Sequence, residues 1–421
     1  MPIKQYRNSK LFIENVNLAD VAEVVDTPAY LYSRSAIENA YREYRNALDQ
    51  DSADAGSRHK VCYAVKANSN LAVLNTLAKL GSGFDIVSVG ELERVLAAGG
   101  DPAGIVFSGV AKKVEEIERA LEAGIHCFNV ESLTELGRIS AIAAAHGIAA
   151  PVSIRVNPDV DAETHPYIAT GLQENKFGID IEDAESIYLE AAANENLRVI
   201  GVDCHIGSQL TTMQPFEDAL SRVLRLIDTL AAENITLGHL DIGGGLGVVY
   251  KDEQPPRIQD YIGALLARLG DRPIDLYLEP GRSIVANAGF LLTRVDTLKS
   301  NPAKNFAIVD AAMNDMLRPA LYDSWMEILP ASLSSNADVK QYDIVGPVCE
   351  TGDFLGKDRA LALNEGDLLC MNSAGAYGFV MASNYNSRPR AAEVMIDCDT
   401  FHVVRDRESF ADLIRGERLL P

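Results

Sequence analysis

The feature that most constrains the fold is a regular alternation of short apolar runs and helical segments between about residues 60 and 280. Such an alternation is typical of parallel strands joined by crossover helices. Eight strand–helix units in roughly 220 residues fit a closed (β/α)8 barrel better than an open doubly wound sheet. We therefore predict a TIM-like α/β barrel with eight strands: Val61–Val65, Phe84–Val87, Ile105–Phe107, His126–Phe128, Val152–Val156, Val199–Cys204, His239–Ile242 and Leu276–Leu278.

Each predicted strand has a polar or glycine residue at or next to its carboxyl end. In barrels of this kind, the binding and reacting groups gather at the carboxyl ends of the strands. We therefore expect the chemistry of this chain at the ends marked by Lys66, Ser88, Ser108, Asn129, Arg155, His205, Gly243 and Glu279.

After Arg282 the helical periodicity fades. Short runs rich in Val, Ile and Leu, separated by Gly, Pro, Asn and Asp, predict a second, mostly β domain. The stretch from Asn314 to Leu329 is predicted to be helical. The strand-like segment TPAYLYS near the start is predicted to pair with this domain. The expected domains are a barrel at 36–283 and a β-rich domain built from 1–35 and 284–421.

Composition excludes several classes of partner. The 38 basic and 60 acidic side chains give a formal charge of -22, which repels nucleic acid and anionic membrane surfaces alike. No apolar run approaches the length that spans a bilayer. The six cysteines stand far apart, without the Cys/His spacing of a metal site, so we expect no metal and a reducing, cytoplasmic compartment.

Lys66, in YAVKAN, follows an apolar strand where its ammonium group would be partly desolvated. A lysine in such a place can form a Schiff base, although a surface lysine at a strand end is the simpler interpretation. The glycine run Gly243–Gly247 (GGGLG) follows the seventh strand, and Glu279–Arg282 (EPGR) follows the eighth. Glycine-rich loops can simply turn, but loops at these two positions recurrently bind phosphate in barrels.

His205, in HIGSQ, ends the sixth strand, and its flat ring could stack on a planar cofactor. The alternative is a packed core histidine. Glu279 could supply a carboxylate to the ring nitrogen of such a cofactor, or could merely form an ion pair with Arg282.

In order along the chain, the motifs are YAVKAN, HIGSQ, GGGLG, EPGR, RPALY (Arg318–Tyr322), CETGD (Cys349–Asp353) and GAYG (Gly375–Gly378). This order resembles the fold-type III pyridoxal-phosphate-dependent decarboxylases, and within them the diaminopimelate decarboxylase family. The resemblance runs from TPAYLYS to the RPR at Arg388–Arg390, and HPYIATG followed by ENKFGI supports the choice of subfamily.

The resemblance implies that pyridoxal 5'-phosphate is bound to Lys66, stacked on His205 and paired with Glu279. It also implies an alanine-racemase-like and ornithine-decarboxylase-like fold, in which the β-rich domain completes the active site and the dimer interface. The implied assembly is a homodimer with shared active sites, in which Cys349 is delivered from the neighbouring subunit. The implied catalytic residues are Lys66, Cys349, His205 and Glu279. The implied cofactor-binding residues are Lys66, Asp85, Ser88, His205, Ser208, Gly243, Gly244, Gly245, Glu279, Pro280, Gly281, Arg282 and Tyr377, and the implied substrate-binding residues are Arg282, Arg318, Tyr322, Glu350 and Tyr377.

The implied reaction is decarboxylation of meso-2,6-diaminopimelate to L-lysine and CO₂, the last step of lysine biosynthesis. Arg318 and Arg282 suit the distal carboxylate of that substrate, and Glu350 suits its distal ammonium group. Either Cys349 or Lys66 could return the proton after CO₂ leaves. The alternatives are a decarboxylase of ornithine, arginine or lysine, a non-catalytic homologue that binds the cofactor, and an unrelated phosphate-binding barrel enzyme.

Overall fold

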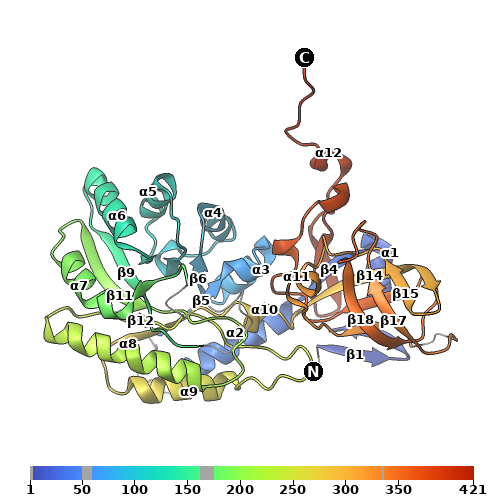
Figure 1. The fold of residues 1–421 in the computed structure, drawn as a ribbon, viewed down its shortest axis with the longest axis horizontal. Coiled ribbons are helices and arrows are strands. Elements are labelled where there is room, and N and C mark those ends of the chain that lie inside the picture. The colour runs from blue at the N-terminus through green and yellow to red at the C-terminus, as the bar shows by residue number, and fades with distance from the viewer. Residues whose placement is uncertain (1–2, 50–58, 162–174, 334–335) are drawn as a thin grey trace. The chain divides into compact units, whose positions relative to one another are not determined.

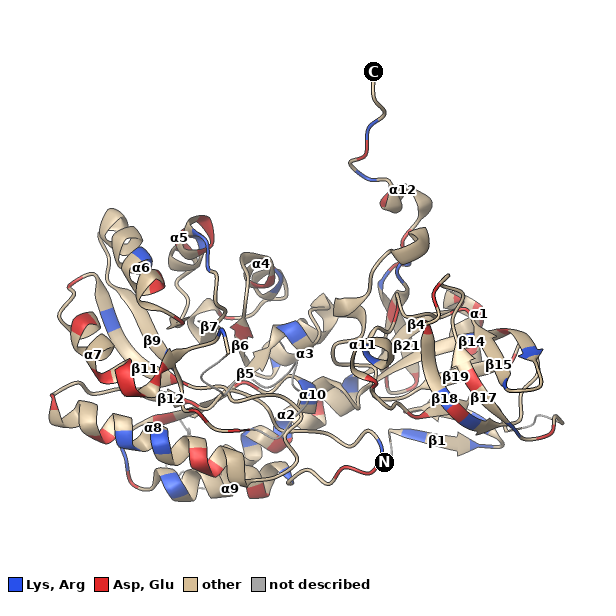
Figure 2. Cartoon of the chain, in the orientation of Figure 1, with Lys and Arg blue, Asp and Glu red and all other residues tan. Residues whose placement is uncertain are grey.

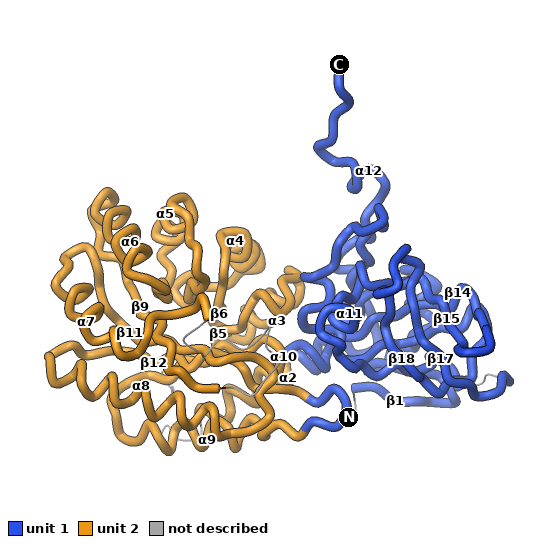
Figure 3. The backbone as a smooth tube through the Cα atoms, viewed as in Figure 1, with its two compact units in different colours: residues 1–37, 249–253, 284–421 blue, residues 38–248, 254–283 orange. Residues whose placement is uncertain are grey.

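The computed structural model describes residues 3–49, 59–161, 175–333 and 336–421 (Figure 1). The HPYIATG motif and the first residue of ENKFGI lie outside these ranges. The chain divides into two compact units (Figure 3). Unit 1 comprises residues 1–37, 249–253 and 284–421, and unit 2 comprises residues 38–248 and 254–283.

Unit 2 is a closed barrel of eight parallel strands. The last strand in the sheet order, β8, pairs with β7 on one side and with β9 on the other, so the eight barrel strands have no free edge among them. The eight predicted strands are therefore confirmed, and a short further strand, β10 (Ile179–Asp180), pairs with β9. The barrel strands are β5 (Lys60–Ala64), β6 (Gly83–Ile86), β7 (Ile105–Phe107), β8 (Cys127–Val130), β9 (Ala150–Asn157), β11 (Leu197–Asp203), β12 (His239–Asp241) and β13 (Asp275–Leu278).

Helices alternate with these strands, and several begin and end at residues that suit a terminus. Ser88 and Ser132 each accept a hydrogen bond from a backbone N–H of the first turn, and Gly124 and Gly147 end helices in the left-handed conformation. The helices are α2 (Arg34–Asp49), α3 (Leu71–Lys79), α4 (Val89–Ala97), α5 (Val114–Ala123), α6 (Leu133–His146), α7 (Ile181–Ala192), α8 (Gln214–Ala232), α9 (Ile258–Leu269) and α10 (Arg282–Val285).

Charges of both signs lie on α8 and α9, which run side by side (Figure 2). Two ion pairs join this part of unit 2: Arg268 to Glu217 at 2.8 Å and Arg272 to Asp228 at 2.9 Å. These pairs are largely exposed, so each stabilises the fold by only about 0–1 kcal/mol. The apolar faces beneath them carry most of the packing.

Unit 1 is mostly β, as predicted. Its larger sheet has the order β18-β17-β15-β14-β4-β20-β21, and β19 pairs with both β14 and β16. Strand β4 (Ala29–Ser33), from the TPAYLYS segment, lies inside this sheet, antiparallel to β14 and parallel to β20. The later strands are β14 (Gly289–Ser300), β15 (Asn305–Val309), β16 (Ile328–Pro330), β17 (Lys340–Val345), β18 (Phe354–Leu361), β19 (Leu368–Met371), β20 (Ala392–Asp397) and β21 (Thr400–Arg405).

Smaller elements complete unit 1. Strands β1 (Lys4–Arg7), β2 (Lys10–Ile13) and β3 (Val16–Asn17) form a three-stranded sheet. Helix α1 (Leu18–Val25) follows them, and α12 (Phe410–Leu413) comes shortly before the C-terminus. Across the ranges that the structure describes, we find no helix both long and apolar enough to cross a membrane.

The predicted helix from Asn314 to Leu329 is wrong. Only α11 (Arg318–Tyr322) is helical there, and β16 begins at Ile328. Pro319 fits the first turn of a helix, but in the interior of a longer helix it would remove a backbone hydrogen bond. Asp323 ends the helix in the left-handed conformation, with φ of 49°. Residue composition favoured a helix, and these two local constraints limit it to one turn.

Candidate active site

The predicted lysine lies at the carboxyl end of the barrel. Lys66 follows β5, and its ammonium group donates to Asp85 Oδ2 at 2.5 Å. The Asp85 side chain, on β6, is fully buried, and its other oxygen, Oδ1, has no hydrogen-bond partner in the described part of the chain. A buried carboxylate oxygen without a partner is costly, so a polar group of a ligand would be favoured there.

Glu279 follows β13 and is buried against polar neighbours at the same end of the barrel. Asn129 Nδ2 donates to Glu279 Oε1 at 3.4 Å and to Ser108 Oγ at 3.1 Å. The carboxylates of Asp203 and Asp241, the last residues of β11 and β12, join Glu279, and one oxygen of each lies within 4.8 Å of the others.

This group of three carboxyls retains protons that exposed carboxyls would release. Burial, and then the charge of Asp241, raise the pKa of Glu279 well above its ordinary value. Burial raises the pKa of Asp241 to about 7, although the Gly243 N–H donates to it at 2.8 Å and opposes the change. Burial and Asp241 also raise the pKa of Asp203, against the pull of Arg155. The group therefore holds at least one proton near neutral pH.

Arg155, another predicted strand-end residue, supplies a buried cation beside this group. Its Nη1 donates to Glu131 Oε1 at 2.8 Å, and its Nε lies 3.7 Å from Asp203 Oδ2. Its guanidinium also stands 4.9 Å from the ring centroid of Phe177. Arg155 thus offsets part of the negative charge of Glu131 and Asp203.

His205 is held as a neutral imidazole. Burial lowers its pKa well below the ordinary value, and the positive charges of Arg155 and Lys66 lower it further. Its Nδ1 accepts a hydrogen bond from the Gly244 N–H at 3.2 Å. The proton of the neutral ring therefore sits on Nε2.

The glycine run beside His205 leaves no room for side chains. Gly243 has φ of +70°, and a Cβ there would stand 2.6 Å from His205 Nδ1. A Cβ on Gly244 would overlap the Glu279 carbonyl oxygen, and one on Gly245, at φ of +110°, would stand 2.7 Å from the Gly207 carbonyl oxygen. The bare backbone forms a cradle between the ends of β12 and β13, of the kind that binds phosphate.

Two further predicted cofactor residues lie around this cradle. Ser208 Oγ accepts hydrogen bonds from Arg282 Nε at 3.2 Å and Nη2 at 3.0 Å. Gly281 packs so closely that a Cβ there would stand 2.9 Å from the Ala67 side chain, next to Lys66. The EPGR turn therefore lies against the segment that carries the lysine.

Ser88 has a structural role that the sequence did not reveal. It is the N-cap of α4, and its hydroxyl accepts from the Glu91 N–H at 3.3 Å. Glu91 in turn accepts from the Val87 N–H at 2.7 Å, and burial raises the pKa of Glu91 to about 7. Ser88 and Glu91 together fix the loop that follows Asp85.

The predicted substrate residues of RPALY lie in unit 1. Arg318 is buried at the start of α11, with its guanidinium 4.6 Å from the ring centroid of Tyr250. Its Nη2 donates to Ser324 Oγ at 3.5 Å. Tyr322 is half-buried on the same helix. Tyr250, which no motif indicated, thus positions the cation.

The CETGD turn, also in unit 1, presents Cys349 and Glu350 to solvent. Buried Asp353 anchors the turn, since its carboxylate accepts from Met313 N at 2.7 Å and from Val348 N at 2.8 Å. The Cys349 N–H donates to Asn386 Oδ1 at 2.8 Å. The thiol and the carboxylate are therefore carried on a turn with a fixed backbone.

Tyr377 lies in GAYG with a strained backbone, at φ of +54°. Its neighbours explain how this conformation is held. A Cβ on Gly375 would overlap the Val285 carbonyl oxygen, and one on Gly378 would stand 2.5 Å from the Ala374 carbonyl oxygen. The close backbone packing on both sides therefore restrains the backbone of the turn that carries Tyr377.

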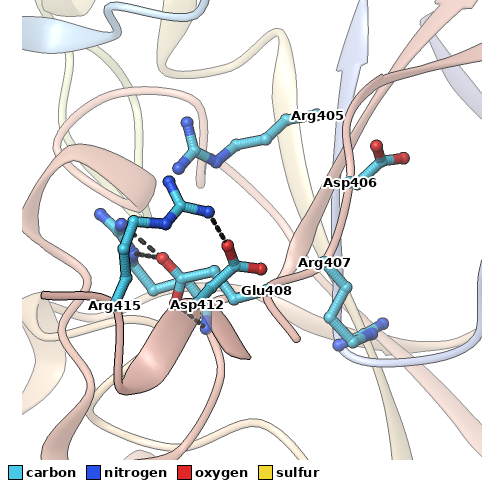
Figure 4. A pocket seen from close by; sticks show the side chains of 7 residues that line it. Arg405, Asp406, Arg407, Glu408, Asp412 and Arg415 are labelled. Atoms are coloured by element: carbon cyan, nitrogen blue, oxygen red, sulfur yellow. Dashed lines mark hydrogen bonds and ion pairs between the residues drawn. The ribbon is translucent and has the colours of Figure 1, made fainter. Parts of the chain in front are cut away.

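A pocket of about 390 Å³ in unit 1 contains none of the predicted site residues (Figure 4). Its charges are largely paired: Arg390 with Glu408 at 2.5 Å, and Arg415 with Asp412. Arg407 donates to the Pro28 carbonyl oxygen at 2.8 Å. These contacts tie the C-terminal segment to unit 1, so the pocket has a structural explanation.

Residues 34–286 match the family model described as pyridoxal-dependent decarboxylase, pyridoxal binding domain. Together with the closed barrel, the lysine at a strand end and the glycine cradle, this match defines the chain as a pyridoxal-dependent decarboxylase.

The chain is 62% identical over 416 residues to the diaminopimelate decarboxylase of Pseudomonas aeruginosa, with 99% of each protein covered. Among solved structures, diaminopimelate decarboxylase from M. jannaschii in co-complex with L-lysine is 39% identical, with a TM-score of 0.95 over 100% of this chain and 98% of that one. The Helicobacter pylori enzyme complexed with L-lysine is 44% identical, with a TM-score of 0.90 over 95% and 98%. The chain belongs to the diaminopimelate decarboxylase family.

Sequence reasoning missed Asp203 and Asp241, which surround Glu279. A signal was available, because each is a buried acidic residue that directly follows a buried aliphatic residue at the end of a strand, two positions before a predicted site residue. Ionisable groups in such strands are rare unless they are paired or functional.

Proposed function

We propose that this chain is a pyridoxal-phosphate-dependent carboxy-lyase that converts meso-2,6-diaminopimelate to L-lysine and CO₂, the last step of lysine biosynthesis. The observation that carries the proposal is the pairing of Lys66 with buried Asp85 at the barrel end that also bears the Gly243–Gly245 cradle. The family membership and the L-lysine complexes of two relatives support the choice of substrate and product.

The residues present fit pyridoxal phosphate at three points. A phosphate suits the side-chain-free cradle, the ring suits a neutral imidazole beside it, and the unpartnered Asp85 Oδ1 offers a hydrogen-bond acceptor. Lys66 would carry the cofactor covalently, and Ser208, the Gly281–Arg282 backbone and Tyr377 would complete the phosphate contacts. When bound, the cofactor supplies an electron sink for the bond to the departing carboxylate.

Glu279 and its neighbours would control a proton at the ring nitrogen. Because Glu279 keeps its own proton in the buried group, it can share that proton with a basic nitrogen placed against it. Asp203 and Asp241 raise the free energy of an ionised Glu279 that lacks such a partner. A cationic ring nitrogen would offset this repulsion. Cofactor binding would therefore stabilise the ionised form of Glu279, and ionised Glu279 would stabilise the protonated ring of the cofactor.

His205 would act through shape and charge rather than as an acid. Its neutral ring, held by the Gly244 N–H, offers a flat face without adding positive charge. Its lowered pKa keeps it uncharged across the neutral range. We therefore assign stacking and orientation to His205.

Substrate choice would rest on the two charges at the distal end of diaminopimelate. Arg318 and Arg282 would bind the distal carboxylate, and Glu350 would bind the distal ammonium group, with Tyr322 and Tyr377 beside them. Ornithine, arginine and lysine lack a distal carboxylate and would forgo its charge-assisted hydrogen bonds with these guanidinium groups. The arginines therefore favour diaminopimelate over these basic amino acids.

We also propose a homodimer that works in the cytoplasm, with each active site completed by Cys349 and Glu350 of the partner chain. Cys349 is an exposed thiol on an anchored turn, which suits delivery to a neighbouring subunit. All six cysteines are free, in keeping with a reducing compartment. Either Cys349 or Lys66 would return the proton to the carbon that loses CO₂.

The covalent role of Lys66 has a direct test. The purified protein should be yellow, and borohydride reduction followed by peptide mapping should place the label on Lys66. Lys66→Ala should lose both the label and the formation of lysine and CO₂ from meso-diaminopimelate, while Lys79→Ala, a matched change at an exposed lysine of α3, should keep both. A label on any other lysine would refute the assignment.

The shared site is tested by mixing inactive variants. Lys66→Ala and the double variant Cys349→Ala, Glu350→Ala should each be nearly inactive alone. When the two variants are unfolded and refolded together, about half of the dimers should be hybrids. Each hybrid has both substitutions in one active site and leaves the other site intact, so activity should return to about a quarter of the parent level. No recovery, beside a parent control that refolds well, would mean that Cys349 and Glu350 act within their own chain.

A further inference from the structure

A second cluster of reactive side chains lies where the barrel strands β8 and β12 begin. His126 immediately precedes β8, Cys127 begins β8, and His239 begins β12. One donor atom from each of the three side chains lies within 4.8 Å of the other two. His239 and Cys127 are buried, whereas His126 is half-buried and reaches the surface of the unit.

The two imidazoles lack the partners that buried nitrogens normally have. Nε2 of His126 and Nε2 of His239 are both buried without a hydrogen-bond partner in the described ranges. A neutral imidazole can offer the lone pair of such a nitrogen to a bound ion.

The surrounding residues hold the rings in place. The His239 ring stacks on Tyr277, with centroids 4.5 Å apart and planes at 17°, and lies 5.2 Å from the His126 ring. Gly201 on β11 leaves the space for His239, since a Cβ there would overlap the imidazole. The missing side chain at Gly201 and the stacked Tyr277 ring together fix the position of the His239 ring.

We propose that His126, Cys127 and His239 bind a divalent transition-metal ion of the Zn²⁺ type. Two imidazoles and one thiolate are ligands that Zn²⁺ prefers, and three protein ligands leave a fourth tetrahedral position for water. His126 provides the entrance from solvent. On binding, the Cys127 S–H bond breaks, a sulfur–metal bond forms, and the proton passes to solvent.

Charged groups near this site both favour and oppose the binding of a cation. Burial, and then the carboxylates of Asp241, Asp203 and Glu279, raise the pKa of the Cys127 thiol well above its ordinary value. The same negative charges favour a bound cation. Lys60 opposes it, since its ammonium group lies 5.3 Å from the centroid of the neighbouring Tyr277 ring.

The site could not be found by motif search. Cys127 and His126 are adjacent, but His239 follows only four strands later along the chain, and their meeting depends on closure of the barrel. We expected no metal on the ground of Cys/His spacing, a criterion that recognises local ligand loops and not clusters assembled across a barrel.

The test uses tag-free, cofactor-loaded protein stripped of metal with a chelator. Equilibrium dialysis against Zn²⁺ with a competing chelator, followed by elemental analysis, should give one tightly bound ion per chain, with release of a proton. Cys127→Ala and His126→Ala should each weaken binding at least tenfold, and Lys60→Met should strengthen it. Cys62→Ala is the matched control, because Cys62 is a buried cysteine packed in the same core cluster.

A second readout separates binding from folding. Zn²⁺ should raise the melting temperature of the parent and of Cys62→Ala, but not that of His126→Ala, whose half-exposed side chain is the least needed for packing. Binding that is equal in the parent, Cys127→Ala and His126→Ala would overturn the proposal, as would a loss in Cys62→Ala as large as that in Cys127→Ala. Because cofactor and activity are not measured, failure here is independent of the proposed decarboxylase function.

Discussion

Lys112 is a fully buried lysine whose removal should destabilise the barrel strongly. Its ammonium group donates to the carbonyl oxygens of Gly109 at 2.8 Å and Asn129 at 2.7 Å, and to Glu135 Oε1 at 2.8 Å. The two side chains of the ion pair are 1% and 4% exposed, so water cannot replace the lost partner. One side chain thus joins the loop after β7, the end of β8 and helix α6.

The expected cost of Lys112→Met follows from this geometry. Methionine fills the apolar space but leaves the Glu135 carboxylate and two carbonyl oxygens buried without a donor. Removing one partner of a buried ion pair costs about 3–5 kcal/mol. At about 2–4 °C per kcal/mol for a unit of this size, the melting temperature of the barrel should fall by about 6–20 °C.

Two variants isolate the cause. Lys113→Met changes the neighbouring exposed lysine and should leave the melting temperature within error of the parent. Adding Glu135→Gln to Lys112→Met should recover part of the loss, because the unpaired buried charge disappears. If Lys112→Met melts like the parent, or if the double variant is no more stable than the single one, then the buried charge does not determine the stability of this region.

Three further predictions concern the glycine cradle, the substrate pocket and pH. Gly244→Ala should raise the dissociation constant for pyridoxal phosphate, measured by absorbance. Gly263→Ala, on the exposed face of α9, should leave that constant unchanged. Equal affinities in the two variants would contradict the phosphate-binding role of the cradle. Arg318→Ala should lower kcat/KM for diaminopimelate by at least about 30-fold, the lower end of ~2–5 kcal/mol, and ornithine and arginine should be poor substrates of the parent; efficient turnover of either would contradict the substrate assignment. Burial raises the pKa of Asp315 to about 7 from 3.8, so the stability it contributes is complete below pH 3.8 and is lost as pH rises to 7. The side chain of Asp315→Asn cannot titrate. The melting temperature of unit 1 should therefore fall less between pH 4 and 7 in this variant than in the parent, and an equal fall in both proteins would contradict the raised pKa of Asp315.

The sequence alone determined the barrel and the end of it that carries chemistry. Strand-forming runs and the polar residue after each of them are local properties, and parallel strands closed into a barrel necessarily bring their carboxyl ends together. For this reason Lys66, His205, Gly243 and Glu279 could be assigned to one barrel end before any contact was known. Family resemblance added the residues of unit 1, whose separate motifs have no periodicity that connects them.

Only the tertiary structure decided which side chains meet. Asp203 and Asp241 lie on neighbouring strands, and their effect on the pKa of Glu279 depends on the register of the closed sheet and on its dry interior. His126 and His239 gather at the opposite end through the same closure. The helix expected over Asn314 to Leu329 fails for the converse reason, since a proline and a left-handed aspartate override the average composition. Patterns along a chain report local conformation and burial, whereas the contacts inside a barrel depend on the register between strands that are distant in sequence, which no local pattern encodes.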